Sequence, residues 1–558
     1  MVAAASRRGS RSSDEAFGCG LGAIGSGPGT IRSGLVGRLG DRTTGGLASG
    51  GERRPAPPSL LPADGSYESS NAGWPDALGG GRSSSGRTTM ALSSLLLRVI
   101  LCSLCAVALG GNEHNFVVVQ RNSFASTERA CSSVTRVSSS DLNRPSVPLM
   151  HRHGPCAPTG AASTNQPSSL AETLCRDRAR RNHIISKASG RLATLSDAGV
   201  RIPTALGDAV DSLEYVVTLG IGTPSVQQTM LIDTGSDLSW VQCKPCNSSE
   251  CYPQKDPLFD PSSSSTYATI PCGIDACKQL VHDFYNHGCT NGTGPSLCQY
   301  GIQYGDGSVT TSLYSTETLT LAPGVTIKNF SFGCGHNQKG PNAKYDGLLG
   351  LGGAPESLVS QVAGQYGDAF SYCLPPGNGT AGFLALGTPG NNTASFVFAP
   401  MHKLAHISTF YVVTLAGISV GGKQLNIPPA VLSKGMIIDS GTVITGLQPT
   451  AYSALRSAFR SAMSAYPLLP PNQDLELDTC YNFTGHSNVT VPKVSLTFSG
   501  GATIDLDVPS GVLLQDCLAF TGGTYDNSIG IIGNVNQRTF EVLFDTGRGN
   551  VGFRPGAC

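Results

Sequence analysis

Charged residues are scarce in this sequence, and neither sign is in excess. Only 14% of the 558 residues are Asp, Glu, Lys or Arg, and the formal net charge is zero. A protein that binds nucleic acid needs a basic surface to neutralise phosphates, and this composition does not supply one. The apolar run at residues 99–109 is also too short for the ~20 residues that span a bilayer. We therefore expect no nucleic-acid partner and no stable membrane span.

A metal-binding signature is missing as well. The sequence contains no H-E-x-x-H motif, which argues against a zinc-dependent hydrolase. His151 and His153 have no third ligand nearby, so we interpret H-R-H-G-P-C as a solvated loop. Cys243 and Cys246 form a C-x-x-C pair, but no second such pair occurs in residues 212–558. The sequence thus predicts no metal site and no cofactor.

Glycine, proline and cysteine, in contrast, are abundant. The 70 Gly and 35 Pro residues suit a turn-rich β protein better than a helical one. The 18 Cys residues indicate metal sites in a reducing compartment and disulfides in a secreted chain. The chain is several times longer than a usual domain of roughly 100–200 residues, so we expect more than one folded unit or a large bilobal one.

The first part of the chain lacks the material of a hydrophobic core. Residues 1–89 are rich in Gly, Ser and Arg without apolar periodicity, which indicates a low-complexity extension that is unfolded or not translated. A transit peptide is the alternative interpretation. Residues 90–110 begin with Met90 and place Arg98 before a short apolar run and small residues, which predicts a signal peptide. A polar segment, residues 111–211, separates them from a strand-rich body.

Two parts of the body resemble each other too closely for chance. The first holds E-Y-V-V-T-L (214–219) and M-L-I-D-T-G-S (230–236), and the second holds F-Y-V-V-T-L (410–415) and M-I-I-D-S-G-T (436–442). An apolar pair followed by Gly comes later in each part, at 348–350 and 531–533. The repeat predicts two duplicated half-domains, each presenting one Asp on a tight turn after a buried strand.

The repeated residues, Asp233 and Asp439, suggest a specific chemistry. Two carboxyl groups held close together cannot both ionise cheaply, so they share one proton. One group then acts as a base toward a water, and the other acts as an acid toward a carbonyl oxygen. Glycine after each Asp permits close approach of the opposite turn, and nearby hydroxyls can hold the carboxylates. The residues expected to support the pair are Thr234, Gly235, Ser236, Ser440, Gly441 and Thr442.

A third D-T-G, at residues 545–547, lacks this context. No apolar pair with Gly follows it, and Arg548 stands where the other two motifs have a hydroxyl residue. Asp and Gly are ordinary turn residues, so we predict a hairpin turn at Asp545.

Together these motifs resemble the pepsin-type aspartic proteases, and specifically the cysteine-rich plant branch typified by nepenthesin. The resemblance covers residues 212–558 and extends to F-D-P-S-S-S-S-T-Y, Y-G-D-G-S, L-D-T-C-Y and I-I-G-N. It implies a mainly β, bilobal pepsin-like fold, with duplicated β lobes at 212–400 and 401–558 and an active-site cleft between them. It also implies a secreted endopeptidase that hydrolyses protein or peptide substrates at acid pH. H-R-H-G-P-C resembles prosegments of this branch, so residues 111–211 are the expected prosegment of a zymogen.

Y-G-D-G-S is similar to the flap hairpin of that family. From propensity alone, Tyr304 is a half-buried aromatic of a strand. The resemblance implies instead a lid residue that closes over substrate, positioned by the indole N–H of Trp240. The residues expected at the flap and in substrate binding are Trp240, Tyr304, Gly305, Asp306, Gly307 and Ser308.

Twelve of the cysteines lie in the body, and this even number favours structural disulfides. Sequence alone does not choose their connectivity, and the six upstream cysteines are assigned no bridge. The resemblance implies the pairs Cys243–Cys246, Cys251–Cys334, Cys272–Cys298, Cys277–Cys289, Cys373–Cys558 and Cys480–Cys517.

Seven N-x-S/T sequons occur in the body and none before it, which agrees with passage through the secretory route. We expect a secreted glycoprotein of the cell wall or apoplast, with the vacuole or a plastid as alternatives. The sequons begin at Asn247, Asn291, Asn329, Asn378, Asn391, Asn482 and Asn488.

Charge differs between the upstream segment and the body. Residues 111–211 hold twelve basic and eight acidic side chains, a net charge of +4, whereas residues 212–558 hold fifteen and twenty-three, a net charge of −8. We expect Coulomb attraction to hold the prosegment and acid to weaken it. A folding aid removed by another protease is the alternative.

The expected partners are therefore protein or peptide substrates and the chain's own prosegment, and we expect a monomer. An enzyme-like inhibitor of a glycoside hydrolase on the same fold is the alternative function. It is disfavoured because both Asp motifs and the flap tyrosine are intact.

Overall fold

The computed structural model describes residues 115–121, 144–151, 170–190, 214–247, 249–280, 288–291, 293–339, 345–376, 381–389, 393–470 and 477–558. All of these residues belong to one compact unit. The predicted extension and signal peptide lie outside the described residues. Within the described part, no helix combines the length and the apolar character needed to cross a bilayer.

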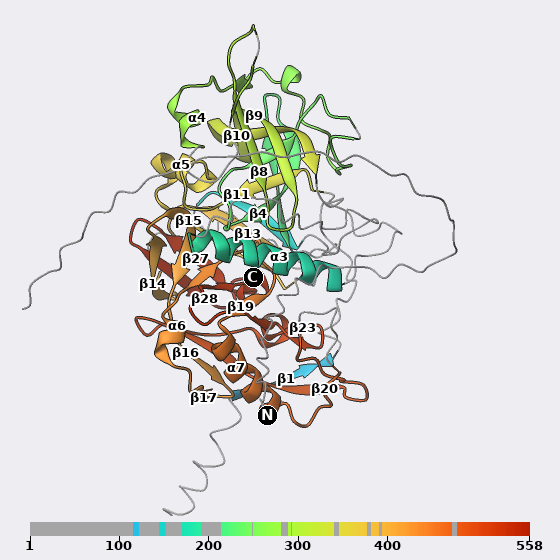
Figure 1. Ribbon diagram of the computed structural model, residues 1–558, viewed down its shortest axis with the longest axis vertical. Helices are drawn as coiled ribbons and strands as arrows, with labels where there is room; N and C mark the ends of the chain where they lie inside the picture. Colours follow the sequence, from blue (N-terminus) through green and yellow to red (C-terminus); the bar gives the residue numbers. More distant parts are fainter. Residues whose placement is uncertain are drawn as a thin grey trace, which may run out of the picture. The chain divides into compact units, whose positions relative to one another are not determined.

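The described residues form mainly β structure with few helices (Figure 1), as the composition predicts. The elements of the N-terminal half of the body are β3 (Tyr215–Ile221), β4 (Val226–Asp233), β5 (Trp240–Gln242), η4 (Pro261–Ser263), β6 (Ala268–Thr269), α4 (Asp275–Gln279), β7 (Gly288–Cys289), β8 (Cys298–Gln303), β9 (Val309–Ala322), β10 (Val325–Lys339), β11 (Gly347–Gly350), α5 (Leu358–Tyr366), β12 (Ala369–Cys373) and β13 (Gly382–Leu386).

The described C-terminal half of the body likewise consists of short strands, with two α-helices and two short helices of other types. Its elements are β14 (Val397–Leu404), β15 (Ile407–Val413), β16 (Leu415–Val420), β17 (Lys423–Gln424), α6 (Pro429–Leu432), β18 (Met436–Ile438), β19 (Thr445–Leu447), α7 (Pro449–Ala462), β20 (Asn488–Pro492), β21 (Val494–Phe498), β22 (Thr503–Asp505), η5 (Val508–Val512), β23 (Leu513–Leu514), β24 (Cys517–Leu518), β25 (Phe520–Gly522), β26 (Gly530–Ile532), η6 (Asn534–Gln537), β27 (Glu541–Asp545) and β28 (Asn550–Arg554).

The strand pairings reproduce the sequence repeat. In the N-terminal half, β4 pairs in parallel with β11, so that Asp233 lies beside Gly350. In the C-terminal half, β18 pairs in parallel with β26, so that Ile438 lies beside Ile532. The two apolar-apolar-Gly runs are therefore the partner strands of the two Asp-bearing strands. Parallel strands buried on both faces read as continuous apolar runs, which is why these segments show no alternation.

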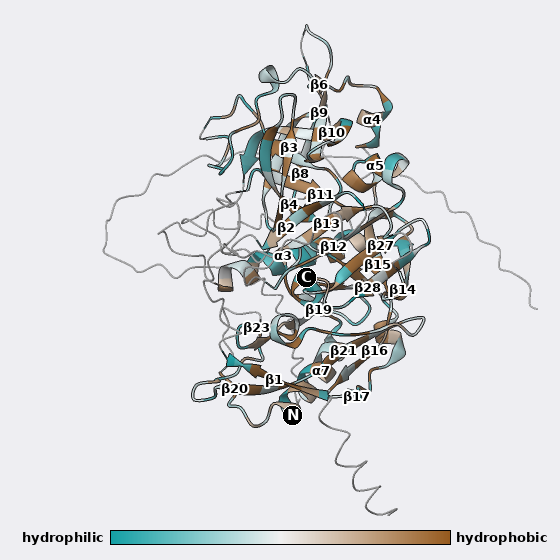
Figure 2. Cartoon of the chain, turned by 180° about the vertical axis from the view of Figure 1, so that it is seen from behind, coloured by the Kyte–Doolittle hydropathy of each residue, from teal (hydrophilic) through white to brown (hydrophobic). Residues whose placement is uncertain are grey.

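A series of antiparallel pairs joins the two halves of the body. It runs from β14 through β28, β27, β12 and β13 to β2 (Ser146–His151), and then to β3. Phe370, Tyr411 and Phe544 pack at its centre with ring centroids 4.6 to 5.8 Å apart. Apolar residues, brown in Figure 2, recur along these strands. The core thus extends across both halves.

The upstream segment contributes three elements: β1 (Phe116–Gln120), β2 and α3 (Leu170–Ala188). The interpretation of His151 as part of a solvated loop is wrong. His151 ends β2, is buried, and packs edge-on against Tyr215, with ring centroids 5.3 Å apart. Pairing of β2 with β3 and β13 buries it, and partners so distant in sequence leave no local signal. His153 lies outside the described residues.

Candidate active site

The two predicted Asp turns lie against each other. The peptide N–H of Thr234 donates to Ser440 Oγ at 3.1 Å, and the peptide N–H of Ser440 donates to Thr234 Oγ1 at 2.9 Å. The Thr234 hydroxyl in turn donates to the carbonyl of Ile438, and the Ser440 hydroxyl donates to the carbonyl of Ile232. These reciprocal bonds between buried groups fix the two strand ends relative to each other, because breaking one would leave its partner unsatisfied.

Each carboxylate is held within its own turn by matching hydrogen bonds. Asp233 accepts from Gly235 N at 2.9 Å and from Ser236 Oγ at 2.6 Å. Asp439 accepts from Gly441 N at 2.9 Å and from Thr442 Oγ1 at 2.5 Å. All six residues expected to support the pair are thus in contact with it or with the opposite turn.

The two glycines permit the close approach, as the sequence predicts. A Cβ added to Gly235 would lie 2.8 Å from Asp439 Oδ1, and one added to Gly441 would lie 2.5 Å from Asp233 Oδ1. Real Cβ atoms do not come that close to a neighbour. Any larger residue would separate the turns.

Arg180 of α3 binds both carboxylates, and the sequence did not single it out. Its Nη2 atom lies 2.6 Å from Asp233 Oδ1 and 3.2 Å from Asp439 Oδ1 and Oδ2. Its Nε lies 3.3 Å from Asp439 Oδ2. One guanidinium therefore occupies the space that faces both carboxyl groups.

The pKa values of the two carboxyl groups move in opposite directions. Burial raises the pKa of Asp233, but Arg180 and the hydrogen bonds from Ser236 and Gly235 outweigh it, so that this pKa lies below its ordinary value. Burial also raises the pKa of Asp439; Arg180 opposes the rise and the charge of Asp233 adds to it, so that this pKa lies above its ordinary value. The environment thus separates the protonation of two similar groups.

Other residues of α3 anchor the helix beside the pair. Asp177 accepts from the backbone N–H groups of Val443 and Ile444, at 2.6 and 3.1 Å, and forms an ion pair with Arg181. Leu174 packs with Val443 and Ile444 in an apolar cluster. At the other end, Ile184 packs in a cluster with Ile407, Phe410 and Ile437.

The predicted flap is the turn between β8 and β9. Tyr304 N donates to Ser308 O at 2.8 Å, and Gly307 takes a positive φ of 87° that glycine adopts without strain. Asp306 accepts from the N–H and the hydroxyl of Ser308. Trp240 Nε1 donates to Tyr304 Oη at 2.8 Å, so the expected contact is present.

Helix α3 lies directly beneath this turn. A Cβ at Gly305 would lie 2.6 Å from the Cα of Arg180. A cavity of about 30 Å³ remains between them, lined among others by His183, Ser236 and Tyr304. That volume holds little more than one water, so the helix nearly fills the space between the flap and the Asp pair.

Two buried side chains, Gln537 and Asp237, support the backbone around the pair by hydrogen bonds. Neither of them was identified from the sequence. Gln537 donates to the carbonyls of Asp439 and Ile532, at 3.3 and 2.9 Å, and accepts from Tyr372 Oη at 2.5 Å. Asp237 accepts from Ala354 N and from Thr409 Oγ1 of the other half, at 2.9 and 2.7 Å. Asp237 lies four residues after Asp233, and Gln537 lies five residues after Ile532. Their closeness to the two repeated motifs was the only feature of the sequence that could have pointed to them.

The third D-T-G forms a hairpin turn, as predicted. Asp545 ends β27 and pairs with Asn550 at the start of β28. Its carboxylate accepts from Arg548 N at 3.1 Å and pairs with the Arg548 side chain at 3.0 Å. Asp545 therefore stabilises its own turn.

Two of the six predicted disulfides, Cys373–Cys558 and Cys480–Cys517, are confirmed. The other four pairings, Cys243–Cys246, Cys251–Cys334, Cys272–Cys298 and Cys277–Cys289, are wrong. The structure pairs Cys243 with Cys334, Cys246 with Cys251, Cys272 with Cys289, and Cys277 with Cys298. Cys175, which was assigned no bridge, is also disulfide-bonded.

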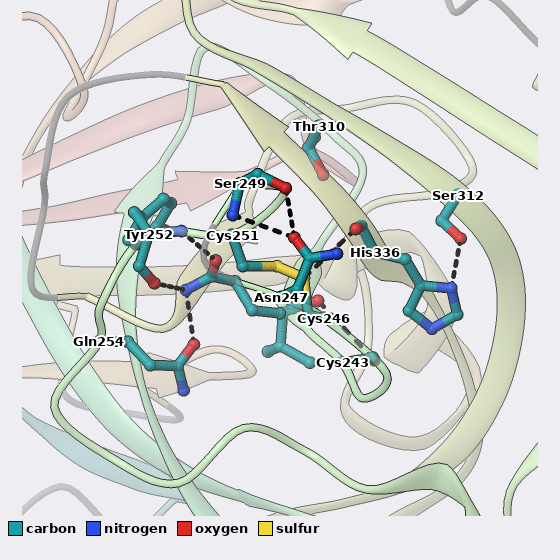
Figure 3. Close-up of a disulfide and its surroundings, with 12 residues drawn as sticks. Cys243, Cys246, Asn247, Ser249, Cys251, Tyr252, Gln254, Thr310, Ser312 and His336 are labelled. Carbon is teal, nitrogen blue, oxygen red and sulfur yellow. Dashed lines mark hydrogen bonds between the residues drawn. A yellow bond between two sulfur atoms is a disulfide. The ribbon is translucent and has the colours of Figure 1, made fainter.

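Strand geometry explains the corrected pairs. Cys243 follows β5, which runs parallel to β10, and this brings its Cα within 5.4 Å of that of Cys334. A turn at Asn247, whose carbonyl accepts from Cys251 N, returns the chain to Cys246 (Figure 3). Cys289 and Cys298 lie opposite each other on β7 and β8, but Cys298 is buried and bonds the buried Cys277, whereas Cys289 is exposed.

Five of the sequon asparagines are described, and all five are exposed; Asn378 and Asn391 lie outside the described residues. The exposed ones are Asn247, Asn291, Asn329, Asn482 and Asn488.

Comparison with known proteins agrees with this arrangement. Family models described as xylanase inhibitor N-terminal and C-terminal match residues 215–388 and 410–555. An aspartyl protease family protein of Arabidopsis thaliana is 39% identical over 84% of this chain and 100% of its own length. Aspartic proteinase nepenthesin-1 of Nepenthes gracilis is 35% identical over 67% of this chain and 85% of its own.

The structure of basic 7S globulin from soybean superposes with a TM-score of 0.50 at 20% identity, covering 61% of this chain and 91% of that one. This likeness bears on the fold alone and identifies it as pepsin-like. The chain belongs to the pepsin-type aspartic protease family, in the cysteine-rich plant branch that includes the nepenthesins.

Proposed function

We propose that this protein is a secreted aspartic endopeptidase, made as a zymogen, that hydrolyses peptide bonds at acid pH. The observation that carries the proposal is the contact of one Arg180 nitrogen with carboxylate oxygens of both Asp233 and Asp439. Two carboxyl groups that share one ligand atom are close enough to share one proton and one water.

The reaction follows from the geometry of the pair. Once Arg180 has left, the ionised carboxylate takes a proton from a water, and the protonated carboxyl gives its proton to the carbonyl oxygen of the peptide. The hydroxide oxygen adds to the carbonyl carbon. In the breakdown of this tetrahedral species, the carboxyl that took the proton of the water gives it to the leaving nitrogen. One hydroxyl of the species returns a proton to the other carboxylate as the C–N bond breaks and the carbonyl forms again. No step requires a covalent enzyme intermediate.

Tyr304 is the proposed lid residue of this reaction. Burial, together with the charge of Asp233, raises the pKa of its hydroxyl well above the ordinary value, so that it stays protonated. Its bond from Trp240 holds the ring toward the Asp pair. Closure of the turn over a substrate would exclude water and align the peptide.

In the proposed zymogen, α3 blocks the site, and acid weakens its hold. Arg180 lowers the pKa of Asp233, so ionised Asp233 favours the docked helix. That contribution is complete above the pKa of the free carboxyl and is lost as the pH falls through the lowered pKa of the docked state. Acid that protonates Asp233 therefore removes part of the attraction that holds α3 at the site.

Self-activation can be tested with purified precursor. Shifting it from neutral pH to about pH 3–4, near the reference pKa values of Asp and Glu, should shorten the wild-type chain by about the mass of its prosegment. The Asp233→Asn precursor should not shorten. Failure of a folded wild-type precursor to shorten, or equal shortening of the Asn variant, would contradict the proposal. Digestion of a denatured protein, with and without pepstatin, then tests the endopeptidase activity.

An enzyme-like inhibitor of a glycoside hydrolase is the second candidate, and the descriptions of the two matching family models favour it. The same digestion separates the two functions. A protein that cleaves nothing at any acid pH after loss of α3, but binds and inhibits a xylanase, would be an inhibitor.

Secretion is the proposed route to its site of action. The signal-like residues 90–110, the exposed sequons and the six described disulfides support it. N-terminal sequencing of the purified protein tests it together with the activation site.

A further inference from the structure

Strand β1 occupies a position different from those of β2 and α3. It pairs with β20 at five consecutive positions, from Phe116 opposite Pro492 to Gln120 opposite Asn488. Backbone hydrogen bonds of 2.9 Å extend the pairing at both ends, from Arg121 N to Ser487 O and from Lys493 N to Asn115 O. Among the strands that the structure describes, β20 has no other partner than β1. Strand β1 therefore satisfies a backbone edge of the body.

The side chains of β1 alternate between the core and solvent. Val119 is 4% exposed, and Val117 packs against the same main core. Both belong to a cluster that includes Val489 and Val491 of β20, which have no exposed surface. Val118, between them, is 65% exposed. This is the period of a strand with one buried face, so β1 contributes to the core of the C-terminal half.

The body also leaves room for the start of β1. The turn between β16 and β17 uses Gly421 and Gly422, with φ values of 55° and 74°. A Cβ at Gly421 would lie 3.2 Å from the Phe116 ring, and one at Gly422 would lie 2.5 Å from Asn115 Cγ. Side chains at these two positions would collide with the start of β1. The two glycines therefore leave the space that β1 occupies.

The forces on β1 differ from those on α3. Helix α3 is held at the Asp pair by ion pairs of Arg180. Strand β1 is held by backbone hydrogen bonds and apolar contacts, with charged residues at its ends, where Lys493 pairs with Asp505 at 3.7 Å and Arg121 lies near Asp516. Release of the helix does not remove any of these contacts.

We propose that the edge of β20 is an acceptor site for an extended apolar segment and that β1 is its resident ligand. When the chain is cut between β1 and β2, β1 stays bound to the body without a covalent link. The molecule that results has two chains. The inference goes beyond the proposed function and holds whether or not the protein cleaves peptides.

The test uses the full chain with a recognition site for a sequence-specific protease placed between Arg121 and Cys131. The Asp233→Asn background ensures that only the added protease cuts. After cleavage, the fragment that contains β1 should elute with the body in gel filtration, and it should separate from the body in a denaturing gel without reductant. Hydrogen exchange should find the amides of β1 and β20 as protected after the cut as before.

Two variants provide a matched pair in the same strand. Val119→Asp places a charge in the core and should weaken retention of the fragment about 100-fold. Val118→Asp introduces the same charge on the exposed face and should retain the fragment like the wild type. The proposal is wrong if the wild-type fragment leaves the body on cutting, if its amides then lose protection, or if the two variants behave alike. The exchange measurement decides the matter even if Val119→Asp does not fold.

Discussion

The two Asp turns have the same internal bonds and different surroundings. Each carboxylate accepts from the glycine two residues on and from the hydroxyl three residues on. Beside Asp233 lie Trp240 and the Tyr304 turn, whereas Gln537 braces the strand end of Asp439 from behind. Duplication thus supplies two equivalent groups, and their neighbours make them unequal.

This difference matters for the chemistry proposed above. Two identical carboxyl groups in identical environments would have no reason to divide the roles of acid and base. While Arg180 is docked, the pKa of Asp233 is lowered and that of Asp439 is raised. The Tyr304 turn and Gln537 are the neighbours that stay unequal after Arg180 has left. The following changes test how much of the asymmetry each neighbour supplies.

Loss of either carboxylate should have the largest effect. Asp233→Asn and Asp439→Asn should each reduce peptide cleavage roughly 10³-fold or more, because neither amide can exchange the proton. The thermal unfolding midpoint should change little. Asp545→Asn is the matched control in the third D-T-G and should cleave normally. Substantial activity in either active-site variant would refute the proposed pair.

Changes at the flap should rank second. Tyr304→Ala removes the lid and should lower kcat roughly 10²-fold with a smaller change in KM, since misalignment acts on the reacting geometry. Tyr304→Phe removes only the bond from Trp240 and should cost less than about tenfold. An unchanged kcat for the alanine variant, measured on an activated sample, would exclude a lid role.

Removing the guanidinium should shift the pH at which the precursor activates. Arg180→Gln removes the charge-assisted bonds that hold α3 to the carboxylates, and it allows the pKa of Asp233 to rise. Docking of α3 is therefore weaker at every pH at which Asp233 of the wild type is ionised. Retention of the helix should weaken about tenfold or more, and self-cleavage should begin at higher pH than in the wild type. Arg178→Gln is the control, because Arg178 lies on the same helix and contacts Cys175 Sγ instead. If self-cleavage begins at the same pH in both variants, Arg180 has no specific role in activation.

The brace behind Asp439 should give the smallest effect on activity. Gln537→Met keeps the volume but removes donors to two carbonyls and the acceptor for Tyr372. We expect a loss of about 1–3 kcal/mol in the free energy of unfolding, because buried groups lose their partners. If Gln537 acts through Asp439, the pH profile of cleavage shifts as well. A stability loss with an unaltered profile would make its role structural.

The pair itself was predictable from sequence, and its blocking helix was not. Each Asp lies next to an apolar strand whose partner strand is also apolar, so the repeat carries the signal. In α3, however, the buried face includes Asp177 and Arg181 between Leu174 and Ile184. Hydrophilic residues along α3, visible in Figure 2, therefore conceal its amphipathic period. The intervals of three and four residues between these buried positions are those of one helix face, and they were the remaining signal in the sequence.

Disulfides and single histidines show a second limit of sequence reasoning. Cys289 and Cys298 lie opposite each other on paired strands, yet they do not bond each other. The exposed Cys289 bonds Cys272, and the buried Cys298 bonds Cys277. Likewise, His151 is buried by strands more than 60 residues away. Such outcomes depend on which face of a sheet a residue occupies, and local composition does not encode that.

The bond between Cys373 and Cys558 closes a covalent ring of the chain around Asp439. A second ring, from Cys243 to Cys334, begins after Asp233. None of the described disulfides spans residues 335–372, which include β11 and α5. A nick inside either ring leaves one covalent molecule, while a nick in this connecting stretch divides the body into one fragment per carboxylate. The two halves that carry Asp233 and Asp439 are thus linked covalently, within the body, by a single uninterrupted stretch of backbone.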